Sequence, residues 1–264
     1  MQILSISDQV IHHIPFITHS PNGVGVVNKA LPVLLAHVDS LPDGLEAIIA
    51  TSDLQGIDRQ NQRLLGHLVN EELDKLADLG RIPSLKSTGV ILAGDFYAKV
   101  DKRGGVGDVR DVWQAFRQRF RWTAGVGGNH DSFGKTQQEF KAFQDERGIN
   151  YLDGNITCLD GLRIAGISGI IGKSTKPFRR SEKDFRKVLS QLLNESPDIF
   201  VMHEGPNDAE AKLVGNESIR AELIKGKDLL VICGHSHWKV PMIALSKGIQ
   251  VLNVDTRVVV MVAN

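Results

Sequence analysis

Short apolar runs recur along the chain, and most of them stop at glycine, aspartate or histidine. The runs are rich in β-branched residues and too short for helices, which is typical of strands buried inside a sheet. The pattern predicts strands at 3–6, 46–51, 88–94, 121–128, 162–171, 198–203, 228–234 and 250–254.

Helical spacing appears between these runs. Apolar residues repeat every four positions at 112–120 and at three- and four-residue intervals at 185–192. Ser181, with Asp184 three residues later, is a start signal for the second helix. Strands that alternate with helices indicate an α/β fold, and we expect one domain over residues 1–264. For residues 1–45 the sequence predicts an added strand and helix. The helix is inferred from the spacing of the apolar positions Val26, Val27, Ala30, Leu31, Leu34 and Leu35.

Composition narrows the classes of function. The chain has 264 residues, with Lys+Arg 31 and Asp+Glu 31, so its formal net charge is +0. This balance argues against a protein that holds nucleic acid through bulk positive charge. The start, MQILSISDQV, lacks a basic segment followed by a long apolar one, and no apolar run approaches the roughly 18 residues of a membrane span. We therefore expect a cytoplasmic protein without a membrane partner.

Residues that can bind metals follow the predicted strands. Sites in open α/β sheets form at the carboxyl ends of the strands, and glycine there lets the backbone approach a ligand closely. Oxygen and nitrogen donors of this mixed kind suit Zn, Mn, Fe or Ni. The candidate ligands are Asp53, Asp95, Asn129, His203, His235 and His237, with Gln55 as a possible seventh.

Two of these positions indicate a site for a pair of ions. His235 and His237 are two residues apart, so in an extended segment both side chains point the same way. They can face one ion, or one each of two neighbouring ions. A carboxylate such as Asp95 can bridge two ions roughly 3.5–4 Å apart.

In this order, the motifs resemble the calcineurin-like metallophosphoesterase superfamily. Its pattern is D-x-H, G-D, G-N-H-D/E, H and G-H-x-H, each after a strand. The corresponding positions here are 53–55, 94–95, 128–131, 203 and 234–237, and the resemblance covers about residues 45–255. It implies a four-layer α/β/β/α sandwich with two mixed sheets and a dinuclear metal site at one edge.

The resemblance also implies a role for each residue. Asp53 and His237 would hold one ion, and Asp95 would bridge the pair. His130 would face the substrate and protonate the leaving oxygen, with Asp131 orienting its ring. The second ion would be held by Asn129, His203 and His235.

The first motif departs from the family pattern, because Gln55 stands where a histidine is expected. An amide oxygen is a weaker ligand than imidazole, which favours a harder ion such as Mn over Fe, Zn or Ni, with Mg also possible. Asp8 offers an alternative first motif, but its third position is Val10, which cannot bind a metal. Asp53 is therefore the preferred first ligand.

The implied reaction is hydrolysis of a phosphate ester by a hydroxide that bridges two divalent ions. Asn129 and His130 would also contact the substrate. Arg179 and Arg180, in the basic segment 172–187, could hold a second phosphate, which favours phosphodiester, nucleotide or nucleic-acid substrates. The alternatives are a phosphomonoesterase or phosphoprotein phosphatase, and a non-catalytic module that binds a phosphorylated ligand because Gln55 weakens the first metal site.

Overall fold

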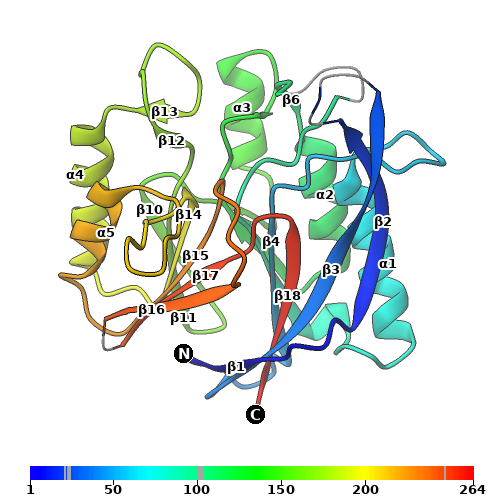
Figure 1. The fold of residues 1–264 in the computed structure, drawn as a ribbon, viewed down its shortest axis with the longest axis horizontal. Helices are drawn as coiled ribbons and strands as arrows, with labels where there is room; N and C mark the ends of the chain where they lie inside the picture. Colours follow the sequence, from blue (N-terminus) through cyan, green and yellow to red (C-terminus); the bar gives the residue numbers. More distant parts are fainter. Residues whose placement is uncertain (21, 23–24, 100–103, 247) are drawn as a thin grey trace.

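Two facing β-sheets with helices on their outer sides make up the chain, shown as a computed structural model in Figure 1. The structure describes residues 1–20, 22, 25–99, 104–246 and 248–264. No helix in these ranges is both long and apolar enough to cross a membrane.

The larger sheet has eight strands in the order β1-β3-β18-β4-β5-β7-β9, with β2 paired to β3. Strands β4, β5, β7 and β9 run parallel to one another, so their carboxyl ends share one edge. The strands are β1 (Ile3–Ile6), β2 (His12–His19), β3 (Val26–Val38), β4 (Ala47–Ser52), β5 (Thr88–Leu92), β7 (Trp122–Gly125), β9 (Ile149–Tyr151) and β18 (Arg257–Ala263).

The second sheet has six strands in the order β10-β11-β14-β15-β17-β16. Its four inner strands are parallel, while β10 and β16 pair antiparallel at the two edges. The strands are β10 (Asn155–Leu159), β11 (Leu162–Ile167), β14 (Ile199–Glu204), β15 (Leu229–Gly234), β16 (Met242–Ser246) and β17 (Ile249–Asn253).

Short elements and helices complete the fold. Two small two-stranded pairs join β6 (Gly107–Asp108) to β8 (Asp131–Ser132) and β12 (Ile170–Ile171) to β13 (Arg179–Arg180). A 3-10 turn, η1 (Leu85–Ser87), precedes β5. The helices are α1 (Leu65–Asp78), α2 (Arg110–Arg119), α3 (Gln137–Gln144), α4 (Glu182–Leu193) and α5 (Glu217–Leu223).

Three apolar layers separate the elements and explain the four-layer arrangement. In β5, Val90 packs with Leu73 of α1 under the first group of helices, whereas its neighbour Ile91 packs with Ile232 of β15 between the two sheets. A third layer joins the second sheet to α4 and α5. Successive strand residues point to opposite faces, so a strand covered on both sides is apolar throughout. The expected α/β sandwich is confirmed.

The structure also confirms the eight strands and the two helices that the sequence predicts. The 162–171 run is divided into β11 and β12, because Gly169 takes a positive φ between them. Ser181 caps α4 as expected, since its hydroxyl accepts a hydrogen bond from the Asp184 backbone N–H at 3.2 Å.

The predicted N-terminal helix is wrong, because residues 26–38 form strand β3. Leu31 and Val33 face the layer under the helices, whereas Ala36 and Val38 face the layer between the sheets, which is the two-residue alternation of a strand. Pro32 cannot donate the hydrogen bond of a helix interior. Pairing with both β2 and β18 overrides the helical spacing of the apolar residues.

The strand assignment predicts opposite responses at two neighbouring positions. Leu31 is fully buried, so Leu31→Ala should lower the free energy of unfolding by about 2–5 kcal/mol. Ala30 is exposed, so Ala30→Lys should change it by less than about 0.5 kcal/mol. Chemical denaturation measures both. A helix would place Ala30 on its apolar face, so a large loss for Ala30→Lys would contradict the strand.

Candidate active site

The candidate ligands meet where strands of both sheets end. Asp53, Asp95 and Asn129 follow β4, β5 and β7 of the larger sheet. His203 lies in β14, and His235 directly follows β15, in the second sheet. The carboxyl ends of parallel strands lie at one edge of a sheet, and the sandwich brings the two edges together.

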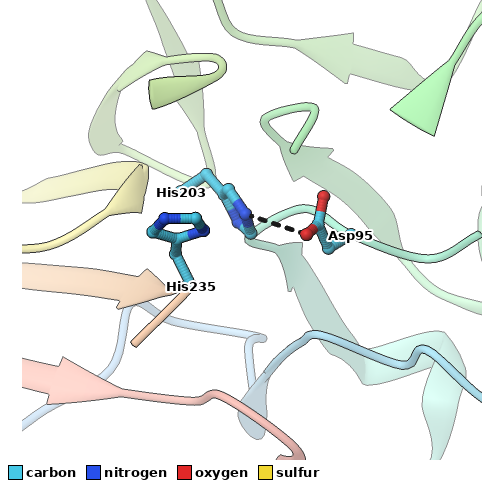
Figure 2. A group of neighbouring side chains, drawn as sticks. All are labelled: Asp95, His203 and His235. Atoms are coloured by element: carbon cyan, nitrogen blue, oxygen red, sulfur yellow. Dashed lines mark ion pairs between the residues drawn. The ribbon is translucent and has the colours of Figure 1, made fainter. Parts of the chain in front are cut away.

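Three of these side chains form a compact group of possible metal ligands (Figure 2). Ligand atoms of Asp95, His203 and His235 all lie within 4.8 Å of one another. Nε2 of His203 is 3.3 Å from Oδ2 of Asp95, and the rings of His203 and His235 have centroids 5.0 Å apart. Nδ1 of His203 donates to the Ala93 carbonyl at 2.8 Å, which leaves Nε2 to face the group. This is the usual orientation of a metal-binding histidine.

Unpaired buried atoms show that the group fits a cation. Oδ1 of Asn129 is buried and has no hydrogen-bond partner among the described residues, and buried Nε2 of His203 has only Asp95 Oδ2 beside it, at 3.3 Å and outside hydrogen-bond geometry. Buried polar atoms are normally paired, and an ion is one of the explanations for an exception. An imidazole nitrogen, an amide oxygen and a carboxylate are ordinary ligands of a transition metal.

The buried carboxylates of this centre also need a neighbouring positive charge to stay ionised. Burial, with the charges of Asp255 and Asp95, raises the pKa of Asp53 to about 8, and burial with the charge of Asp95 raises that of Asp131 to about 6. Burial alone would lower the pKa of His203, but the charges of Asp95 and Asp53 outweigh it and raise the pKa to about 10. Buried carboxylates therefore hold their charge here only when a cation lies beside them.

Three residues of the site adopt left-handed backbone conformations. The φ values of Asp53, Asp95 and His235 are 53°, 60° and 64°, a region that costs non-glycine residues about 1–3 kcal/mol each. Each backbone N–H is held in place: Asp53 by the Gly94 carbonyl at 2.9 Å, Asp95 by Asp131 Oδ2 at 2.8 Å, and His235 by Asp53 Oδ2 at 2.9 Å. The surrounding hydrogen bonds therefore impose the geometry of the ligands.

Two motif glycines allow the close approach of these segments. A Cβ atom on Gly128 would overlap the Asp95 carboxylate, and one on Gly234 would overlap Ser52 and Asp53. Larger residues at either position would push the ligands apart, which explains why glycine belongs to each motif.

The Asp131 carboxylate contacts three backbone N–H groups in this structure. Its carboxylate accepts hydrogen bonds from the backbone N–H groups of Asp95, Phe96 and Gly128 at 2.8, 2.7 and 2.9 Å. It thus ties the loop after β5 to the loop after β7. Among the described residues, the partner of the His130 ring is instead the carbonyl of Gly105.

His130 lies beside Asp95 with its ring fixed. Its backbone N–H donates to Asp95 Oδ1 at 2.8 Å, and Nδ1 donates to the Gly105 carbonyl at 3.0 Å. Because a carbonyl only accepts, the proton is on Nδ1, and Nε2 is the atom available for proton exchange with a substrate.

The residues expected at the first ion are arranged differently. Gln55 turns its amide nitrogen to Asp95 Oδ2 at 3.1 Å, so it acts here as a hydrogen-bond donor. Nδ1 of His237 donates to Asp255 Oδ2 at 2.7 Å, and the ring is exposed. Within the described ranges, neither Asp53 nor His237 belongs to the compact ligand group.

Sequence reasoning missed Asp255, which orients His237 and lies close enough to raise the pKa of Asp53. A signal was present, since Asp255 follows the strand predicted at 250–254, as the other candidate ligands follow theirs. Asp8 is exposed and outside the ligand group.

A pocket of about 210 Å³ opens beside the ligands. Asp53 and Gln55 line it, together with residues of β2 and β3, whereas Asp95, His203 and His235 do not. The predicted substrate residues Arg179 and Arg180 do not line it; Arg180 is instead paired with Asp153. The lining also includes Phe16, Lys29, Tyr97, Lys99, Gly105 and Asp255.

Two solved structures are similar to this chain, and the first of them supports the fold. The TT1561 protein of Thermus thermophilus is 20% identical, with a TM-score of 0.56 over 80% of this chain and 90% of that one. The phosphopantetheinyl hydrolase PptH of Mycobacterium tuberculosis is 15% identical, with a TM-score of 0.49 and the same coverage. No curated protein matches the sequence.

The sequence itself matches the profile of the calcineurin-like phosphoesterases over residues 47–239, which is well over half of the chain. This range contains every motif of the site, from Asp53 to His237. With the sandwich fold and the ligand group at its edge, the match shows that the chain belongs to the calcineurin-like phosphoesterase family of metal-dependent hydrolases.

Proposed function

We propose that the protein hydrolyses phosphate esters at a dinuclear metal centre. The observation that carries the proposal is the compact group of Asp95, His203 and His235, with the unpaired Asn129 Oδ1 beside it. Asp95, Asn129, His203 and His235 would hold one ion. Asp53 and His237 would hold the other, with Asp95 shared and Gln55 contributing either its oxygen or its hydrogen bond to Asp95. Mn²⁺ is the proposed metal, because Gln55 makes the first site rich in oxygen.

Divalent ions in such a centre polarise the phosphoryl group and lower the pKa of a bound water. The chain supplies the remaining groups. The amide of Asn129 would donate a hydrogen bond to a phosphoryl oxygen, where negative charge develops. Nε2 of His130 would protonate the leaving oxygen as a general acid. The Nδ1 atom of this ring bonds to Gly105, which lines the pocket, so we propose that the leaving group occupies the pocket.

The preference for phosphodiesters or nucleotides needs a different support from the one that the sequence suggested. Arg179 and Arg180 do not line the pocket, so they do not support this substrate preference. Lys29 and Lys99 do line the pocket and offer positive charge for a second anionic group. We therefore propose substrates with more than one negatively charged group, and we propose that the second group binds in the pocket.

A second candidate function is binding without turnover. Its support is the turn of Gln55 toward Asp95, which leaves one compact ligand group in the described structure. Such a protein would hold one ion and a phosphorylated ligand. Metal stoichiometry and hydrolysis of aryl phosphates distinguish the two functions.

His130→Ala should leave metal content unchanged and lower turnover of an alkyl phosphate by about 10²–10⁴-fold, because the leaving alkoxide needs a proton. The loss should be much smaller with p-nitrophenyl phosphate, whose leaving group is stable without protonation. Steady-state kinetics on the two substrates, with metal analysis, measures the effect. Equal losses on both substrates, or loss of metal, would contradict a general-acid role.

Gln55→His should strengthen the first metal site, because imidazole is a better ligand than an amide oxygen. At low Mn²⁺ concentration, the variant should bind two ions per chain where the native protein binds closer to one. Gln55→Ala is the matched control and should bind no more than the native protein. Titration calorimetry gives both stoichiometries, and an unchanged number for Gln55→His would remove Gln55 from the metal site.

A further inference from the structure

The hairpin of β2 and β3 packs against the loop that contains the first metal motif, residues 53–55. Ile17 of β2 and Ile57 exchange two backbone hydrogen bonds, at 3.0 and 2.9 Å. The Thr18 hydroxyl donates to the Gln55 carbonyl at 2.8 Å. The ring of Phe16 lies so close to Gly56 that a Cβ atom there would overlap it. The hairpin therefore holds the loop that carries Asp53 and Gln55.

This hairpin lies outside the region that the family shares. The match to the family begins at residue 47, whereas β2 and β3 span His12–His19 and Val26–Val38. In Figure 1 the two strands stand at one side of the molecule, away from the second sheet and its helices. What the hairpin adds to the pocket is therefore outside the part of the chain that matches the family profile.

The added wall combines an apolar surface with positive charge. Phe16 and Lys29 are direct cross-strand partners, and both line the pocket. Lys29 is exposed, so its ammonium group can turn toward a ligand without being desolvated first. Tyr97 and Lys99 bring the same pairing of ring and ammonium group from the loop after β5.

The size of the pocket limits what it can hold. A cavity of about 150 Å³ accommodates a benzene ring, so 210 Å³ has room for one ring with a small charged substituent. Asp53 and Gln55 line the pocket, and Gly105, which holds the ring of His130, also lines it. Because His130 is the proposed general acid, a group bound beside Gly105 is on the side of the leaving oxygen in the proposed function.

We propose that the hairpin forms a leaving-group subsite for phosphate esters whose leaving group carries a planar apolar ring and a second negative charge, with Lys29 binding that charge. The inference rests on the proposed function and makes it more specific. Lys29 acts on the binding of the substrate, whereas the chemical step belongs to the residues around Asp95 and His130.

The test compares phenyl phosphate with 4-carboxyphenyl phosphate, which differ by one negative charge on the ring. The Mn²⁺-loaded native protein should show about tenfold lower KM for the carboxylated substrate. Lys29→Ala should remove this difference through KM, with kcat unchanged, and Lys29→Glu should reverse it. Lys187→Ala is the control, because Lys187 is an equally exposed lysine on α4, at the opposite side of the molecule.

Equal KM values for the two substrates in the native protein, or a difference that survives in Lys29→Ala, would overturn the subsite. A protein that hydrolyses neither these monoesters nor the diester bis-p-nitrophenyl phosphate would instead contradict the proposed function. Calorimetry with phenylphosphonate and 4-carboxyphenylphosphonate, with and without Mn²⁺, then decides the subsite separately. A preference for the carboxylated compound that is lost in Lys29→Ala supports it, and equal affinities overturn it.

Discussion

The buried carboxylate of Asp95 is the interaction on which the site depends. It accepts hydrogen bonds from the His130 backbone and the Gln55 amide, and it lies 3.3 Å from His203 of the opposite sheet. Its own backbone is fixed by Asp131. A carboxylate with so little contact with water needs positive charge nearby, which the imidazolium of His203 or a metal ion can supply.

The need to gather several ligands around one positive charge accounts for the left-handed backbone conformations at the site. Positive φ values at Asp53, Asp95 and His235 direct three ligands from two different sheets toward one region. Buried strands behind them, with apolar side chains on both faces, supply the rigidity that keeps these conformations in place. The stability of the sandwich thus maintains a ligand arrangement that would be unfavourable in a flexible chain.

The sequence predicts the strands and the candidate ligands because each rests on a local pattern, whereas the sandwich is what the resemblance to the family implies. An apolar run followed directly by a ligand residue singles out His203, and a run followed by glycine and a ligand residue singles out Asp95, without knowledge of the fold. Tertiary contacts decide the rest. β3 looks helical until its pairing with β2 and β18 is known, and the hydrogen bonds of Asp131 to three backbone groups depend on loops from two strands. For the same reason, the basic residues that the sequence singled out are not those that line the pocket.

We propose that Asp95, Asn129, His203 and His235 form the stronger metal site, while Asp53, Gln55 and His237 form a weaker one. Anomalous diffraction from crystals grown with limiting Mn²⁺ tests it most directly. The account predicts a strong peak bounded by the first four residues and a weaker one between Asp53 and His237 that grows as the Mn²⁺ concentration rises. A single peak at Asp53 and His237, or no ion beside His203, would contradict it.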